Sequence, residues 1–362
     1  MSVLSIIIGI LVIGLIVFVH EFGHFIIARK SGVSVPEFWI GFGPKLISFK
    51  LMGTEFSLRP ILFGGACIFD EIDPEEDDAS AFLTRRIPSE GLLNDQSPWV
   101  RLQVLFAGPF FNLLLGFICS MIVIAAAGID FPVIQSLSEG YPAEEAGLEP
   151  GDLITGIDSA SIYTFRDLQL YLNDYRGGQP VTIRFERDGE ERSVQLTPLY
   201  DEEYDAWYIG IRVSGYRDPA RSGSQILFYS FHEVGYWIRY TVHALKDLFT
   251  GNIPVTSLSG PVGVVSAVSD VVQETSKAGA GLVLLNLANI IAILTVDIGV
   301  MNLLPVPGLD GGRILLVLVE LIRGKRLPEK GEYAVTLAGI ALLLLLMIFV
   351  FFKDIMQAAG LF

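Results

Sequence analysis

The sequence predicts a polytopic α-helical membrane protein with about four transmembrane helices and one small α+β domain. Hydrophobic residues make up 51% of the 362-residue chain and charged residues 18%, which is less charge than the roughly 25% of a typical soluble domain. Four apolar stretches are each long enough to cross a bilayer, which takes about 20 helical residues. They cover residues 3–28, 102–128, 281–304 and 334–352.

The first apolar stretch has the position of a secretory signal peptide. It lacks a basic N-terminal region, however, and its second half contains His20, Glu21 and His24. A segment that is removed after export has no use for such residues. We therefore expect a retained transmembrane helix.

Basic residues near the ends of the apolar stretches predict the orientation of the chain. They follow the first stretch, open the second at Arg101, and cluster between the third and fourth over residues 313–330. Cytoplasmic loops carry such an excess of Lys and Arg. We expect both termini outside, the 30–100 loop inside, and the 129–280 segment outside.

The charge balance and the cysteines exclude some kinds of function. The formal net charge is −15, and because phosphate binding needs a basic surface, this argues against a nucleic-acid partner. Cys67 and Cys119 are far apart and form no CxxC pair. They therefore indicate neither a disulfide framework nor a thiolate zinc site, and we expect both to be small apolar fillers.

Three segments outside the apolar stretches have readable patterns. Residues 33–69 alternate apolar and polar positions with Gly and Pro between them, which predicts short strands joined by turns. The acidic run 70–78 is expected to be a solvated loop. Residues 225–249 mix aromatic and basic side chains, which predicts an amphipathic helix at the outer membrane surface.

Residues 130–200 predict a compact soluble unit. A PAxxAGLxxGDxIxxI pattern leads into a strand over 153–157, followed by an amphipathic helix over 166–175 and a hairpin that turns at Asp188-Gly189. This pattern resembles a PDZ domain of the circularly permuted bacterial kind. The resemblance implies capture of peptide termini or strand edges by strand addition.

The motif His20-Glu21-Phe22-Gly23-His24 predicts a metal site. On a helix the two histidines lie one turn apart on one face, which is the spacing of two ligands to one zinc ion. Glu21 beside them can take a proton from water that zinc activates. Charged groups inside an apolar span are costly, by roughly 2.5–3.5 kcal/mol each, which favours function over a structural polar cluster.

A catalytic zinc site takes three protein ligands, and the third is not adjacent in sequence. Asp310 is the candidate, because the stretch 302–312 around it contains two prolines and three glycines and is expected not to hold a regular helix. Unwound backbone at membrane depth is tolerated where it lines a cavity or is buried in protein. Asp297, in the same apolar stretch, is a second candidate.

Several motifs together resemble the bacterial site-2 proteases, most closely the regulator of sigma-E protease group. They are HEFGH in the first span, AGPFFN over 107–112, SGP over 259–261 and NLLPVPGLDGG over 302–312, together with the PDZ-like insertion. The well-studied member of that group has two tandem PDZ domains, whereas this chain has room for one. Asp297 also stands where the family usually has Asn.

The resemblance implies roles for further residues. It implies that Asp310 completes a Zn²⁺ site with His20 and His24, and that residues 33–69 form a membrane-re-entrant β-element that receives an unwound substrate strand. The substrate-binding residues that follow from it are Asn302, Pro305, Pro307, Asn112, Gly64 and Gly65.

The resulting expectation is an intramembrane zinc metalloendopeptidase in the bacterial inner membrane, with the PDZ domain outside and the active site towards the cytoplasm. Its partners would be single-pass transmembrane substrates, the lipid bilayer, and peptide termini at the PDZ domain. The expected divisions are 1–128, 129–215, 216–280 and 281–362, two membrane halves around a PDZ domain and an amphipathic connector. A non-catalytic membrane PDZ scaffold and a metal transporter are the alternatives.

Overall fold

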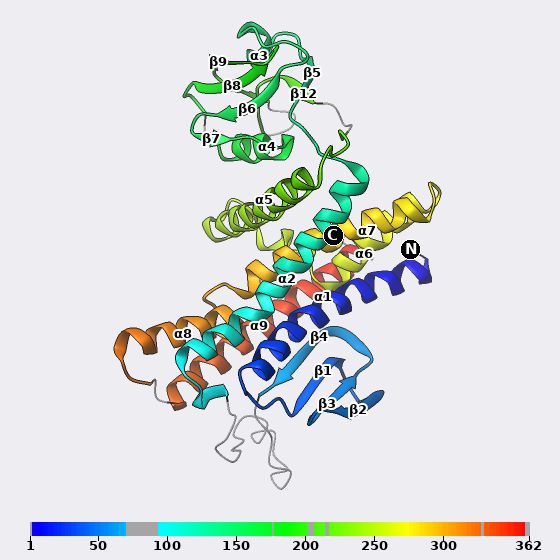
Figure 1. The fold of residues 1–362 in the computed structure, drawn as a ribbon, viewed down its shortest axis with the longest axis vertical. Coiled ribbons are helices and arrows are strands. Elements are labelled where there is room, and N and C mark those ends of the chain that lie inside the picture. The colour runs from blue at the N-terminus through cyan, green and yellow to red at the C-terminus, as the bar shows by residue number, and fades with distance from the viewer. Residues whose placement is uncertain are drawn as a thin grey trace. The chain divides into compact units, whose positions relative to one another are not determined.

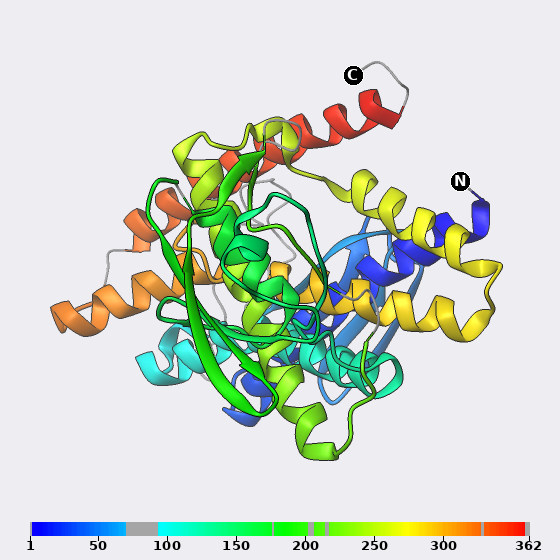
Figure 2. The ribbon, with the colours of Figure 1, turned by 90° about the horizontal axis from the view of Figure 1, so that it is seen from above.

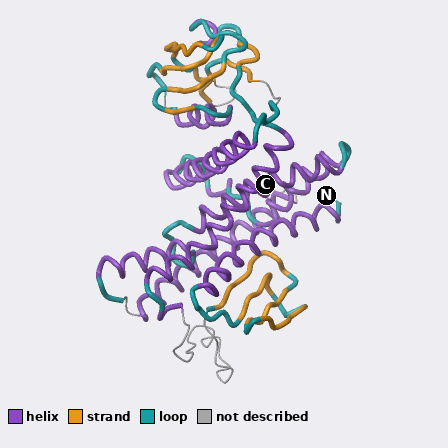
Figure 3. Tube along the Cα trace, viewed as in Figure 1, coloured by secondary structure: helices purple, strands orange, loops and turns teal. Residues whose placement is uncertain are grey.

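The computed structural model describes residues 2–69, 93–175, 177–201, 206–213, 217–326 and 329–358. The chain divides into two compact units, one formed by Met1–Cys119 with Thr241–Phe362 and the other by Ser120–Tyr240. We call the first the membrane unit and the second the inserted unit. Figure 3 shows that long helices dominate the membrane unit, which also contains one sheet, and that the inserted unit is richer in strands.

Each of the four apolar stretches forms one continuous helix (Figure 1). These helices are α1 (Val3–Lys30), α2 (Pro98–Ala127), α7 (Ala280–Asn302) and α9 (Glu329–Ala358). Among the described residues they are the helices long and apolar enough to cross a membrane. Exposed apolar side chains follow one face of α1 at helical spacing, from Leu4 through Ile7, Leu11 and Leu15 to Phe18. Such a face is stable against lipid and not against water.

Shorter helices complete the membrane unit. They are α6 (Pro261–Ser276), α8 (Asp310–Arg323), the last part of α5 (Gly223–Thr250), and the 3₁₀ turns Leu93–Asp95 and Val255–Ser257. Helix α6 packs against α1, α7 and α9, and Figure 2 shows it beside α1. Its contact with α1 is close because a Cβ on Gly9 would lie only 3.1 Å from Val265 Cα. The hydroxyls of Ser5 and Ser269 share a buried hydrogen bond of 2.6 Å in the same contact.

The short strands predicted over residues 33–69 are confirmed. They form a four-stranded sheet in the order β2-β3-β1-β4, in which β1 and β3 are parallel and the other pairs antiparallel. The strands are β1 (Glu37–Phe42), β2 (Ile47–Leu51), β3 (Thr54–Leu58) and β4 (Ile61–Ile68). Strand β4 lies against α1, so one edge of this sheet is held beside the HEFGH motif. The acidic run 70–78 lies outside the described residues.

The inserted unit has its own apolar core. A sheet in the order β7-β6-β8-β9 and two two-stranded sheets, β12-β5 and β10-β11, surround it. The elements are β5 (Ile134–Leu137), α3 (Pro142–Glu145), β6 (Leu153–Ile157), β7 (Ala160–Ser161), α4 (Phe165–Asp174), β8 (Val181–Arg187), β9 (Glu190–Leu196), β10 (Leu199–Asp201), β11 (Ala206–Tyr208) and β12 (Ile211–Val213). The side chains of Ile154, Ile157, Leu168 and Ile183 are fully buried in that core.

The predicted hairpin is confirmed, and its turn residues explain it. Asp188 and Gly189 have φ angles of +54° and +80°, as both central residues of the type I′ turn that suits two-residue hairpins do. The strand predicted over 153–157 is β6. The helix predicted over 166–175 is α4, which begins and ends one residue earlier.

The prediction that no regular helix forms over residues 302–312 is confirmed for 303–309 and wrong for 310–312. Helix α7 ends at Asn302, but α8 begins at Asp310 and includes Gly311 and Gly312. A Cβ on Gly311 would lie 2.2 Å from Leu303 O. These glycines therefore do not break the helix but let its first turn pack directly on the preceding backbone.

Candidate metal centre

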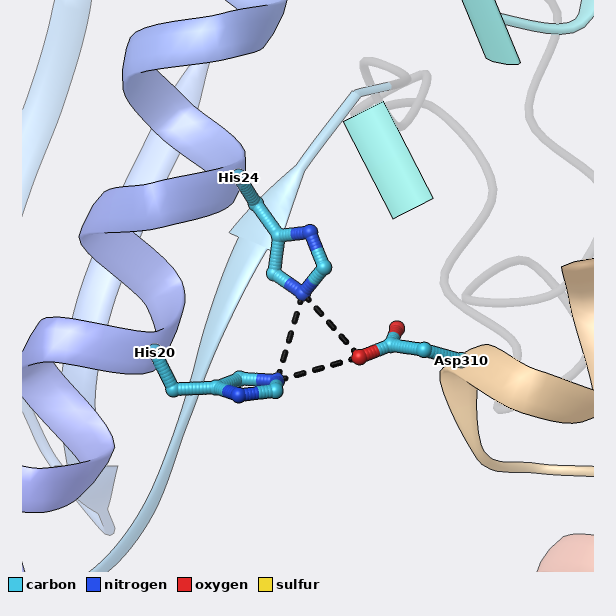
Figure 4. Close-up of side chains that lie close together, drawn as sticks. All are labelled: His20, His24 and Asp310. Carbon is cyan, nitrogen blue, oxygen red and sulfur yellow. Dashed lines mark hydrogen bonds and ion pairs between the residues drawn. The ribbon is translucent and has the colours of Figure 1, made fainter. Parts of the chain in front are cut away.

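Helix α1 presents two buried imidazoles from one face. His20 and His24 are four residues apart, and only 8% and 5% of their surfaces are exposed. Side chains at this spacing lie one above the other on a helix, and their Nε2 atoms are 3.2 Å apart. Figure 4 shows both rings directed away from α1 towards the same point.

Asp310 reaches that point from the first turn of α8. Its Oδ2 atom lies 3.1 Å from His20 Nε2 and 3.2 Å from His24 Nε2, which closes the triangle drawn in Figure 4. This buried oxygen accepts no hydrogen bond from the described residues. Of the described residues, only these three form a group of His, Cys, Asp or Glu side chains spaced to hold a metal ion.

The triangle fits a tetrahedral zinc ion. Zinc binds imidazole nitrogen and carboxylate oxygen at about 2.0–2.1 Å, which places two tetrahedral ligands about 3.3–3.4 Å apart. The three donor atoms are 3.1–3.2 Å from one another, so small movements bring all of them to bonding distance. A bound ion would also satisfy the orphaned Asp310 oxygen, because metal coordination uses the same lone pair as a hydrogen bond.

The far nitrogen of His24 is held by the backbone of α2. Its Nδ1 lies 2.8 Å from Val104 O, and because a carbonyl can only accept, Nδ1 carries the proton. The lone pair is then on Nε2, the atom that faces Asp310. This outer contact is typical of metal-ligating histidines.

The side chain of Asn112 contacts the far nitrogen of His20, as Val104 O contacts that of His24. Its side-chain nitrogen lies 3.3 Å from His20 Nδ1, while its Oδ1 is buried without a partner among the described residues. A half-turn of this amide directs Oδ1 at a protonated Nδ1, which satisfies both groups and leaves Nε2 unprotonated. Asn112 is fully buried, so its contact with His20 is enclosed by protein.

Gly108 of α2 makes room for both imidazoles. A Cβ at this position would lie 2.3 Å from His24 Nε2 and 2.8 Å from His20 Cε1. Gly23 permits the same close approach from α1, since its Cβ would lie 2.6 Å from Ala107 O. Sequence reasoning gave neither glycine a role. The sequence does carry one signal for Gly108: it lies four residues before Asn112, on the same face of the predicted helix.

Glu21 lies beside the triangle on α1. A Cβ on Gly65 of β4 would come within 3.1 Å of Glu21 Cγ. The edge strand of the sheet therefore lies against the one acidic side chain of the HEFGH motif.

Asp297, the second candidate ligand, lies elsewhere. Its Oδ1 accepts a 2.5 Å hydrogen bond from the Thr241 hydroxyl of α5, and it is not part of the group formed by the described His and Asp side chains. Its neighbour Thr295 donates to Asn112 O at 3.1 Å. The carboxylate thus ties α7 to α5, while the opposite side of α7 contacts α2.

The remaining candidate residues occupy the α7–α8 connection and β4. Asn302 is the last residue of α7, and Pro305 and Pro307 lie in the non-helical segment after it. Pro307 O packs against Gly339 of α9. Gly64 faces the ring of Phe42, whose Cε2 would be 2.3 Å from an added Cβ.

Cys67 and Cys119 are both buried and unpaired, which fits the expectation of apolar fillers. Cys67 lies in β4 and Cys119 in α2. The reactive thiolate form is disfavoured at such buried apolar positions.

Known proteins similar to this chain fall into two groups. Over 356 residues it is 33% identical to a Clostridium acetobutylicum protein, covering 98% of both chains, and over 368 residues it is 33% identical to an Agrobacterium fabrum protein, covering 97% of this chain and 95% of the other. Both relatives are named provisionally as zinc metalloproteases. Among solved structures, PDZ domains of SdrC-like proteins from Listeria monocytogenes and Listeria innocua match 24% and 25% of this chain and 87% and 100% of theirs, with 22% and 25% identity and TM-scores of 0.21 and 0.22.

The sequence profile of peptidase family M50 matches residues 8–346. The match includes the HEFGH helix, the inserted unit and the helix that begins at Asp310. Members of this family depend on zinc, and the named relatives agree. The chain belongs to peptidase family M50, the site-2 proteases, and is a zinc metalloprotease of the membrane.

Proposed function

We propose that this protein is an intramembrane endopeptidase that cuts membrane-spanning proteins within or near their transmembrane segments. One observation carries the proposal: the donor atoms of His20, His24 and Asp310 meet within 3.2 Å of one another, with His20 and His24 on an apolar helix long enough to span a bilayer. A metal site on such a helix favours substrates that reach it through the membrane.

The protein groups supply binding, orientation and proton transfer. Zinc, when held by His20, His24 and Asp310, supplies a Lewis acid that activates water and polarises a peptide carbonyl. Glu21 accepts the proton from water at its carboxylate and returns it to the leaving amide nitrogen. The close approach of Gly65 in β4 to Glu21 Cγ restricts where that carboxylate can lie.

Strand β4 is suited to hold the substrate. A peptide bond inside a helix is protected, so the substrate must unwind before it is cut. Among the described residues β4 pairs with β1 alone and is an edge strand of the sheet. An extended substrate can add to such an edge through backbone hydrogen bonds, and Gly64 and Gly65 keep this part of the strand free of side chains.

In this proposal the sheet enters the membrane from the cytoplasmic side, and Asn302, Pro305 and Pro307 line the substrate groove with Asn112 close to the metal. The exposed apolar side chains of Ile47, Phe49 and Leu51 on β2 support contact between the sheet and lipid.

The protein is placed in the bacterial inner membrane, with the inserted unit on the outer side and the metal centre towards the cytoplasm. The basic residues that flank the helices support this orientation. The inserted unit, acting as a PDZ domain, would bind peptide termini or edges of single-pass substrates. Release of anti-sigma factors and removal of signal-peptide remnants are the corresponding processes.

Purified protein in liposomes, incubated with a single-pass transmembrane reporter, tests the activity. The Glu21→Gln variant keeps the metal ligands and the shape of the side chain but removes the base, so we expect full zinc content and a loss of cleavage of about 10²–10⁴-fold. Cleavage by Glu21→Gln at the wild-type rate would refute the assigned base. Absence of cleavage by the zinc-loaded wild type, with binding of the reporter retained, would favour a scaffold.

A pair of carboxylate variants tests the third ligand. Asp310→Ala removes one corner of the triangle and is expected to lose bound zinc, whereas Asp297→Ala breaks the contact with Thr241, outside the triangle, and is expected to keep it. Metal analysis of the two purified variants decides between them. Zinc loss in Asp297→Ala alone would transfer the assignment to that residue.

A further inference from the structure

One face of α2 contacts both histidines of the candidate metal centre. Residues 101, 104, 108 and 112 are spaced by three, four and four, which places them in one stripe along a helix. Val104 holds His24, Asn112 contacts His20, and Gly108 packs against both imidazoles. The fourth member of the stripe, Arg101, has no part in the function derived above.

Arg101 forms a buried ion pair with Glu320 of α8. The distance from Nη1 to Oε2 is 2.5 Å, and the two side chains are 5% and 6% exposed. Buried charges require a partner, because desolvation of a lone charge is expensive. The pair therefore joins α2 and α8 at one defined point.

This point lies on the same helix as Asp310. Asp310 is the first residue of α8, and Glu320 follows ten residues later, with the buried Val317 between them on the same side. Leu315, Leu318 and Ile322 are exposed. One side of α8 therefore packs against the rest of the membrane unit. On that side Asp310 contacts the histidines at the start of the helix, and Glu320 contacts Arg101 near its end.

We propose that Arg101 and Glu320 are positioning residues for Asp310: their ion pair sets the direction and rotation of α8, and so the place of the Asp310 carboxylate. The inference rests on the proposed function, since it takes Asp310 as a metal ligand. In this arrangement one stripe of α2 orients all three ligands, His24 through Val104, His20 through Asn112, and Asp310 through Arg101 and Glu320.

Zinc affinity, measured by competition with a chelator on the full-length protein in detergent, tests the proposal. Glu320→Gln and Arg101→Gln remove the charge pairing, and we expect each to weaken zinc binding by about 10–100-fold, the usual effect of losing an outer-shell partner. Arg101→Lys keeps the charge and is expected to restore most of the affinity. The visible spectrum of the cobalt-substituted protein provides a second readout, because it responds to the position of the ligands.

Glu233→Gln is the matched control. It breaks another ion pair, the partly buried Arg166–Glu233 pair at 2.6 Å in the inserted unit, and should leave zinc affinity and the cobalt spectrum unchanged. If Glu320→Gln and Arg101→Gln lower the melting temperature but bind zinc as tightly as wild type, the pair is only structural and the inference is wrong. If zinc binding also survives Asp310→Ala, the proposed metal site itself is wrong.

Discussion

At Gly108 the candidate metal centre requires a residue without a side chain. The distance of 2.3 Å between an added Cβ and His24 Nε2 is shorter than any normal contact. The ring cannot easily move away, because Val104 O holds its other nitrogen. Even one methyl group at this position must therefore displace a metal-binding atom.

We expect Gly108→Ala to weaken zinc binding on the order of tenfold or more, as measured by chelator competition. Gly116→Ala on the same helix is the control, because its Cβ would meet Val296 Cγ2 at 2.6 Å, in the contact between α2 and α7. It should lower thermal stability and leave zinc affinity unchanged. Equal zinc affinities in wild type and Gly108→Ala would contradict this account of the site.

Asp152 gives the inserted unit a pH-dependent contribution to stability. Its own burial raises its pKa, but hydrogen bonds from Arg187 at 2.6 and 2.7 Å and from the Glu149 N–H at 2.9 Å outweigh that effect. The net pKa lies below the ordinary value of about 3.9. The unfolded chain therefore takes up the proton first as the pH falls. The stabilisation is complete above the unfolded pKa and is lost as the pH falls through the folded one.

Asp152→Asn is expected to destabilise the inserted unit by roughly 1–3 kcal/mol at pH 7 and by progressively less below about pH 4. Hydrogen exchange of residues 148–157 in the full-length protein, compared with wild type at each pH, measures the difference. A deficit that stays constant between pH 7 and pH 3 would show that the Asp152 charge is not its source.

The residues with local signatures were predictable, and those with tertiary roles were not. HEFGH has the spacing of two ligands within one helix, and Asp310 stands out as a carboxylate among prolines and glycines. Nothing local distinguishes Arg101 or Glu320 from other charged residues at a helix end. Their pairing joins positions 219 residues apart, which a single sequence does not encode as a pattern.

At the scale of elements, strand β4 places the sheet next to Glu21, the proposed general base. A Cβ on Gly65 would lie 2.9 Å from Trp39 O on one side and 3.1 Å from Glu21 Cγ on the other. An added methyl must therefore move either β4 away from β1 or the Glu21 carboxylate away from the metal centre.

Gly65→Ala is expected to lower kcat/KM for a transmembrane reporter by roughly 10–100-fold while zinc content stays at the wild-type level, since only alignment is lost. Gly53→Ala is its control: this glycine has φ of +83° in the β2–β3 turn, with no atom within 4 Å of the added Cβ, so only local strain arises. Wild-type kcat/KM in Gly65→Ala would mean that the β4–Glu21 contact has no role in catalysis.

Helices and strands were predicted well from the sequence where a single local pattern determines them. Long apolar stretches predicted the four long helices, because backbone groups in lipid must be satisfied within the segment. Alternation and turn residues predicted β6 and the β8–β9 hairpin. The start of α8 was not predicted, because glycine has a low helix propensity. In the folded chain Gly311 packs closely on Leu303 O, a contact that the sequence alone does not reveal.

At the scale of the whole molecule, the orientation in the membrane is the feature most directly open to test. In a background where the buried Cys67 and Cys119 are replaced by serine, Glu139→Cys and Lys325→Cys each give one exposed thiol, in the inserted unit and in the connection after α8. We expect a membrane-impermeant maleimide to label position 139 in intact spheroplasts, and position 325 only after permeabilisation. The reverse pattern would invert the proposed topology.

The metal centre is tested most directly by zinc K-edge absorption spectroscopy on the purified protein, together with metal analysis. We expect one zinc ion per chain, coordinated at about 2.0–2.1 Å by nitrogen and oxygen donors with two imidazoles, and loss of that ion in Asp310→Ala. A spectrum with sulfur ligands at about 2.3 Å, or an unchanged zinc environment in Asp310→Ala, would contradict the assignment of His20, His24 and Asp310.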